Sequence, residues 1–85
     1  MEEKKIGVVD HYFSHVGVGI IKIEQDGLKL GEIIHIKGHT TDFQQTVESM
    51  QIERKIIQEA KVGEKAGIKV NEPVREGDQV YKVIS

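Results

Sequence analysis

The fold class is decided by the stretch from residue 28 to residue 38, LKLGEIIHIKG. It begins with a turn, because Gly31 adopts positive φ without strain and the carboxylate of Glu32 can accept hydrogen bonds from nearby backbone N–H groups. After the turn, Ile34 and Ile36 alternate with polar neighbours, which is the period of a half-buried strand. The stretch therefore predicts a tight turn that leads directly into a β-strand.

Two further pairs, Gly63-Glu64 and Gly77-Asp78, repeat this turn signal later in the chain, and we expect at least one of the three glycines to have positive φ. The segments with the β-branched and aromatic content of strands are residues 5–13, 16–23, 33–38, 65–70 and 79–84. Residues 48–61 are ambiguous, since their propensity fits an amphipathic helix as well as strands. Short strands between glycine turns predict an all-β barrel or sandwich.

The composition places the chain among single globular domains. Its 85 residues suit one domain, residues 1–85, with 38% hydrophobic and 31% charged residues. The formal net charge of −2 argues against a protein that binds nucleic acid mainly by neutralising phosphates, and leaves room for a small basic patch. There is no cysteine, which excludes disulfides, thiolate metal sites and cysteine nucleophiles. Without a long apolar run or a signal peptide, the expected location is the cytoplasm, with no membrane partner.

The residues also resemble a known family. The segments 28–36, 47–52, 60–68 and 75–80 are similar, in order, to the β-barrel second domain of translational GTPases of the elongation factor Tu class. The segments GHTTDF at 38–43 and SMQ at 49–51 resemble segments of stand-alone bacterial and archaeal proteins described as translation elongation factor-like. Similar barrels form the C-terminal domain of collagenase-like peptidases, some of which act in tRNA hydroxylation.

The resemblance implies a small closed six-stranded β-barrel. It also implies that residues 47–54 form a strand, with any helical turn confined to residues 55–60. Six side chains that alternate with polar neighbours are expected to point inward: Ile34, Ile36, Val47, Ile52, Ile68 and Val80.

Catalysis has little support in the sequence. It contains no Gly-x-Ser-x-Gly, no His-Glu-x-x-His and no phosphate-binding Gly-x-x-x-x-Gly-Lys-Ser/Thr motif, so we expect no GTP binding, no cofactor and no catalytic residues. The four histidines, His11, His15, His35 and His39, fit solvated turn and strand positions better than a metal site. An enzyme with unrecognised chemistry remains the least favoured alternative.

The candidate binding residues are Asp10, Tyr12, Arg54 and Lys55. The first three resemble positions that hold the aminoacyl end of transfer RNA in elongation factor Tu, and Lys55 extends the positive charge. Tyr12 also fits a core position, since a small barrel must fill its interior.

Two departures from the family pattern make the aminoacyl pocket incomplete: Val9 stands where the factor has an acid, and Glu53 where it has a histidine. Further lysines, Lys61, Lys65 and Lys69, fit either a phosphate-facing edge or the protection of an exposed strand edge.

The sequence therefore favours a non-enzymatic module that binds structured RNA (tRNA or rRNA) or a ribonucleoprotein surface. The alternative is a protein-docking module for a separately encoded enzyme such as a collagenase-like peptidase. An exposed basic groove would favour the first reading, and an apolar patch the second.

Overall fold

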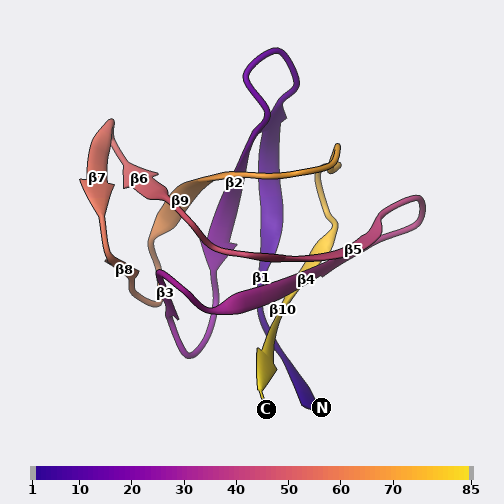
Figure 1. Ribbon diagram of the computed structural model, residues 1–85, viewed down its shortest axis with the longest axis horizontal. Coiled ribbons are helices and arrows are strands. Elements are labelled where there is room, and N and C mark those ends of the chain that lie inside the picture. The colour runs from indigo at the N-terminus through magenta and orange to yellow at the C-terminus, as the bar shows by residue number, and fades with distance from the viewer. Residues whose placement is uncertain (1, 85) are drawn as a thin grey trace.

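A computed structural model describes residues 2–84 as strands joined by turns (Figure 1). The strands are β1 (Glu2–Phe13), β2 (Val18–Ile23), β3 (Leu28–Lys29), β4 (Ile33–Lys37), β5 (Asp42–Thr46), β6 (Met50–Ile52), β7 (Lys55–Ile57), β8 (Glu59–Ala60), β9 (Lys65–Lys69) and β10 (Gln79–Ile84). The all-β prediction is confirmed. Residues 55–60 contain no helical turn, because they form β7 and β8. Within residues 2–84, no helix is long and apolar enough to cross a membrane.

The prediction of a closed six-stranded barrel is wrong. Eight strands form one antiparallel sheet in the order β5-β4-β10-β1-β2-β9-β6-β7, and β3 pairs with β8 in a separate two-stranded sheet. The large sheet curls around the interior, but its edge strands β5 and β7 do not pair with each other (Figure 1). Closure fails because the short strand β6 turns back into the β6–β7 hairpin, which places β7 at the edge of the sheet.

A buried side chain joins β5 to the end of β9, on the side where the sheet does not close. The Gln45 amide on β5 donates to the carbonyl oxygen of Lys69 at 2.8 Å, and its oxygen accepts from the backbone N–H of Asn71 at 2.8 Å. Gln45 is only 7% exposed. One amide thus takes the place of a pair of backbone hydrogen bonds, since it offers both a donor and an acceptor.

The core lies inside the curl of the large sheet. Five of the six side chains expected to point inward are fully buried, and Ile52 is half-buried against the same cluster. The inward residues of β4, Ile34 and Ile36, are 0% exposed, while His35 between them faces outward. Each buried aliphatic side chain contributes roughly 1.5–3 kcal/mol, so this alternation fixes which face of each strand is external.

The three glycine–acid turns share one hydrogen-bond pattern. Gly31, Gly63 and Gly77 have φ of +89°, +93° and +90°, which confirms the prediction for all three. In each turn the acid accepts from the backbone N–H of the basic residue three positions earlier. The bonds are Lys29 to Glu32 at 2.6 Å, Lys61 to Glu64 at 2.6 Å and Arg75 to Asp78 at 2.9 Å.

Each turn is also bonded to a residue of another segment. The glycine N–H donates to the carbonyl of that residue, whose own N–H donates to the carbonyl of the acid. The partner is Val47 for the first turn, Ile23 for the second and Val9 for the third. The turns therefore fix tertiary structure as well as local reversals.

Candidate functional site

The outer face of β2, β9, β6 and β7 carries a row of side chains with a gap in its middle. The strand register places Ile20, Gly67, Gln51 and Ile56 directly opposite one another in that order. Opposite residues of antiparallel strands share one face of the sheet. Because Gly67 has no side chain, the row is hollow at β9, between Ile20 on one side and Gln51 on the other.

This hollow is the floor of a groove of about 340 Å³, which we call the β9 groove. Its lining comes from β2, β6, β9 and the β6–β7 turn: Val18, Ile20, Ser49, Gln51, Glu53, Arg54, Lys65, Gly67 and Lys69. The volume lies at the lower end of the range for ligand-binding clefts. The groove has an apolar floor and a charged rim.

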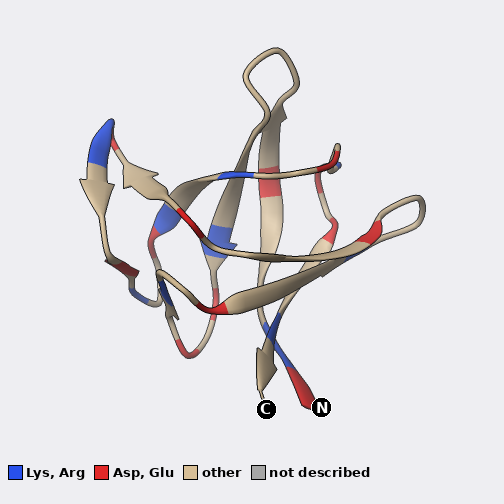
Figure 2. Ribbon diagram, viewed as in Figure 1, with Lys and Arg blue, Asp and Glu red and all other residues tan. Residues whose placement is uncertain are grey.

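The rim of the β9 groove is positive although the chain is negative overall. It holds the three cations Arg54, Lys65 and Lys69 and the two carboxylates of Glu53 and Asp10, a net charge of +1. Lys65 is paired with Asp10 at 3.4 Å. Between residues 2 and 84 we find no ion pair that involves Arg54 or Lys69. Figure 2 shows basic segments at the tip of the β6–β7 hairpin and on β9.

The β6–β7 hairpin has a strained tip. Glu53 and Arg54 form its two-residue turn, and their φ values are +51° and +68°. Such turns favour Asn-Gly, because both central residues must be left-handed. Two non-glycine residues there cost on the order of 1–3 kcal/mol each, and strain of this kind collects at binding sites. Beyond the tip, Ile56 is 79% exposed. The hairpin thus presents a guanidinium and a large apolar side chain at the surface of the domain.

The structure separates the four predicted binding residues. Arg54 lines the β9 groove, and Asp10 lies at its rim through the ion pair with Lys65. Asp10 is the extra residue of a bulge where β1 pairs with β2. Lys55 is paired with the core-facing Ile52, so it projects from the other face of the hairpin.

Tyr12 packs against the core and lines a different hollow, of about 500 Å³, with residues 40–43 and 72–75. The predicted binding residues Asp10, Tyr12, Arg54 and Lys55 therefore do not form one surface, and only Asp10 and Arg54 meet at the β9 groove.

Other members of the site had weaker signals in the sequence. Lys65 and Lys69 were predicted as candidate edge residues, and the structure joins them with Arg54 but leaves Lys61 in a turn. Gly67 interrupts the alternation of a strand, which is a recognisable signal for close approach of another chain. Nothing in the sequence marks Ile56 as exposed, because its orientation depends on the two-residue turn.

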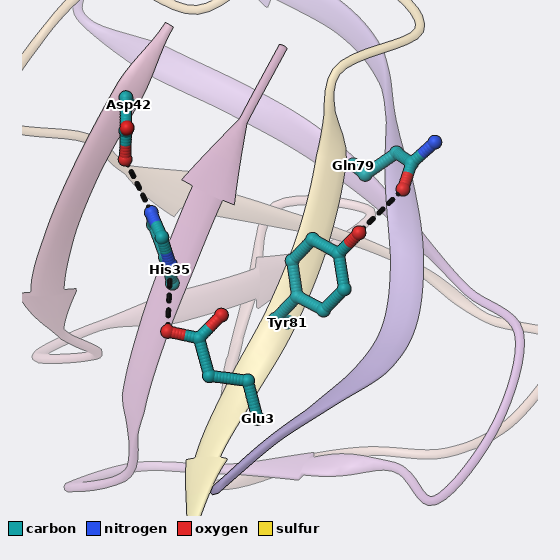
Figure 3. A network of polar contacts seen from close by, with 5 residues as sticks. All are labelled: Glu3, His35, Asp42, Gln79 and Tyr81. Carbon is teal, nitrogen blue, oxygen red and sulfur yellow. Dashed lines mark hydrogen bonds and ion pairs between the residues drawn. The ribbon is translucent and has the colours of Figure 1, made fainter. Parts of the chain in front are cut away.

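A second polar feature lies on the outer face of β4. The Nδ1 atom of His35 is 2.7 Å from a carboxylate oxygen of Glu3, and its Nε2 atom is 2.5 Å from one of Asp42 (Figure 3). The His35 side chain is 13% exposed, which differs from the predicted solvated histidine. Nearby, Tyr81 donates to Gln79 at 2.6 Å.

These contacts favour the protonated form of His35. The hydrogen bond to Asp42 raises the pKa of His35; partial burial opposes the rise, and the bond to Glu3 adds to it. The bond to His35 in turn lowers the pKa of Asp42. The two acids lie on opposite sides of the imidazole ring, so the three groups do not converge on one metal ion. In the described part of the chain, no group of three histidines or acids is arranged to hold a metal.

Comparison with known proteins relates the chain to peptidases. No family model matches it. It is 45% identical over 78 residues to an uncharacterized protease of Methanocaldococcus jannaschii, covering 91% of this chain and 19% of that protein. It is 38% identical over 72 residues to a Porphyromonas gingivalis collagenase, covering 84% of this chain and 20% of that protein. The chain therefore spans about a fifth of the length of these relatives.

The fold agrees with this relationship. The C-terminal domain of a Geobacillus thermoleovorans protein described as a U32 peptidase superposes with a TM-score of 0.87 at 18% identity, covering 95% of this chain and 93% of that one. The chain is thus homologous to a segment of peptidases and collagenases and has the fold of a C-terminal domain. These relatives are named as enzymes, but the homology covers only a small part of each of them.

The comparisons correct the functional interpretation. The predictions of a translation elongation factor-like protein, of RNA or tRNA binding and of a role in protein biosynthesis are contradicted, because the similar proteins are proteases and a collagenase. The likeness to translational GTPases rested on short segments that include the three glycine–acid turns. The protein-docking alternative agrees better with the relatives.

Proposed function

We propose that residues 1–85 form a non-catalytic docking domain that binds the catalytic portion of a collagenase-like peptidase. The observation that carries the proposal is the 45% identity over 91% of this chain to a fifth of a protease. A segment of that size adds a domain to a larger protein, and domains within one assembly contact each other through limited, partly polar surfaces.

The surface of the chain supports a binding role rather than a catalytic one. The β9 groove contains cations and aliphatic side chains, but no nucleophile beside a histidine and no pair of converging carboxylates. The large apolar side chain of Ile56 is 79% exposed, and the turn at Glu53 and Arg54 is strained. Features that cost stability without serving the core are expected where a partner binds.

The test uses a chimera in which the 78 matched residues of the M. jannaschii protease are replaced by the corresponding residues of this chain. Hydrogen exchange is measured by mass spectrometry for the chimera and for the free chain. Docking predicts that surface strands exchange at least about tenfold more slowly in the chimera, because the interface must open before exchange. As a control, the chain is joined by a Gly/Ser linker to an unrelated protein of similar size. Equal exchange in all three proteins refutes the proposal.

A further inference from the structure

We propose that the β9 groove receives an extended acidic segment of the peptidase portion, with carboxylates at Arg54 and Lys69 and an apolar side chain over Gly67, between Ile20 and Gln51. This inference rests on the proposed function and deepens it, because it names the surface and the chemistry of the segment that binds there.

The shape of the groove depends on Gly67. A glycine inside a strand weakens the strand, and its common reasons are a bulge or the close approach of another chain. The ladders of β9 with β2 and β6 pass through Gly67 without a shift in register, so there is no bulge here. A Cβ atom at this position would lie 3.4 Å from side-chain atoms of Ile20 and of Val18, at the floor of the groove. The absence of a side chain at Gly67 therefore leaves open the space above β9 that forms the groove.

The charge of the rim selects an acidic partner. The groove and its rim have a net charge of +1, with Asp10 counted, in a chain whose net charge is −2. Arg54 presents a planar fork of donors that matches a carboxylate in a bidentate manner. Asp10 already neutralises Lys65, so Arg54 and Lys69 are the cations that need an external anion. Two such cations, with the carboxylate of Glu53 beside them, suit a pair of acidic side chains rather than a polyphosphate backbone.

The width of the groove favours an extended segment. Two strand spacings separate β2 from β6, which is about 10 Å between the backbones that carry Ile20 and Gln51. The side chains of Ile20 and Gln51 narrow this opening below the roughly 10–12 Å diameter of a helix with side chains. In an extended segment, alternate side chains point in opposite directions. One set can then contact the apolar floor while the other reaches away from it.

The edge of β7 adds a second mode of contact. β7 pairs with β6 on one side only, so its other edge offers free backbone groups to an extended chain. Ile56 lies in the middle of this strand and is 79% exposed. A large apolar side chain next to an unpaired strand edge favours aggregation unless a partner covers it. The peptidase portion that supplies the proposed segment also covers Ile56.

The experiment compares variants in the chimera and in the free chain. Hydrogen exchange is measured for wild type, for the double variant Arg54→Glu/Lys69→Glu, for Gly67→Val and for the control Lys61→Glu. Lys61→Glu makes the charge change of one of these two substitutions, in a turn outside the groove. Circular dichroism of each free chain establishes that it is folded, and Gly67→Ala replaces Gly67→Val if the larger side chain prevents folding.

We expect β6, β7 and β9 to exchange at least about tenfold more slowly in the wild-type chimera than in the free chain. In chimeras that carry the double variant or Gly67→Val, these strands should exchange at rates within about twofold of those in the free chain. The double variant loses the charge match, and the valine side chain fills the floor of the groove. Lys61→Glu should behave as wild type. Raising the salt concentration should weaken the protection, since rim charges are screened.

The outcomes distinguish this inference from the function on which it rests. Slow exchange on another face of the domain overturns the groove assignment and leaves the docking function standing. No slowing anywhere overturns both. Protection that survives the double variant refutes an acidic occupant. Protection of the groove in the free chain on addition of total RNA, with none in the chimera, also overturns the inference.

Discussion

Replacing Gly63 with alanine tests the turn that links β8 to β9. Gly63 has φ of +93°, and a Cβ atom built there would find no neighbouring atom within 4 Å. The cost of the substitution is therefore backbone strain alone, without a clash. A left-handed conformation costs an L-residue about 1–2 kcal/mol, so Gly63→Ala should lower the free energy of unfolding by about that amount. For a domain of this size, each kcal/mol corresponds to a fall in Tm of about 4–8 °C.

Gly67→Ala is the matched control, because it makes the same chemical change inside a strand. Its φ lies outside the left-handed region, and the added Cβ makes ordinary contacts at 3.4 Å or more. We expect this variant to be neutral or up to about 1 kcal/mol more stable than wild type, since glycine weakens a strand interior. Urea and thermal unfolding followed by circular dichroism measure both variants. Equal losses at the two positions, or no loss for Gly63→Ala, would refute the assignment of strain to the turn.

Three further predictions concern polar groups of the fold. An NMR titration should place the pKa of His35 above the usual value of about 6.5, and Asp42→Asn should lower it. Because the pKa is raised in the folded state, the stability that His35 contributes is present below pH 6.5 and is lost as the pH rises through the raised pKa; an unchanged pKa in the Asp42→Asn variant would contradict this. Gln45→Ala should cost about 1–3 kcal/mol, because it leaves a buried N–H and C=O without partners, whereas a loss below the error of urea unfolding would show that water replaces the amide. Glu64→Gln should cost less than Glu64→Ala, which removes the acceptor entirely and should lose about 1 kcal/mol; equal stability of both variants in the same assay would refute the role of this acid in its turn.

The sequence predicted best what is decided locally. The turn at Gly63 depends on two adjacent residues, and the inward positions of Ile34 and Ile36 follow from the period of one strand. Both are independent of how distant segments meet. The same local signals misled the family assignment, because a glycine next to an acid stabilises a tight turn in any small β domain.

The sequence could not predict what depends on the meeting of remote segments. Whether the sheet closes is decided by the short hairpin at Glu53 and Arg54, a pair of residues that carries no recognisable signal for a two-residue turn. That turn also sends Arg54 and Lys55 to opposite faces, which divided a predicted basic patch. His35 gains its partners from β1 and β5, so its protonation state follows from tertiary structure.

The place of β10 in the sheet has a consequence for how the chain folds. β10 comprises residues 79–84 and lies between β4 and β1, so it joins the β5–β4 pair to the remaining five strands of the sheet. During synthesis from the N-terminus, β1 and β4 each have an unpaired edge until β10 is made. Pairing between residues that lie so far apart in sequence makes folding slow, and unpaired edges expose intermediates to aggregation. A ribosome stalled before residue 79 should therefore carry an aggregation-prone chain, which a chaperone must hold until the last strand is inserted.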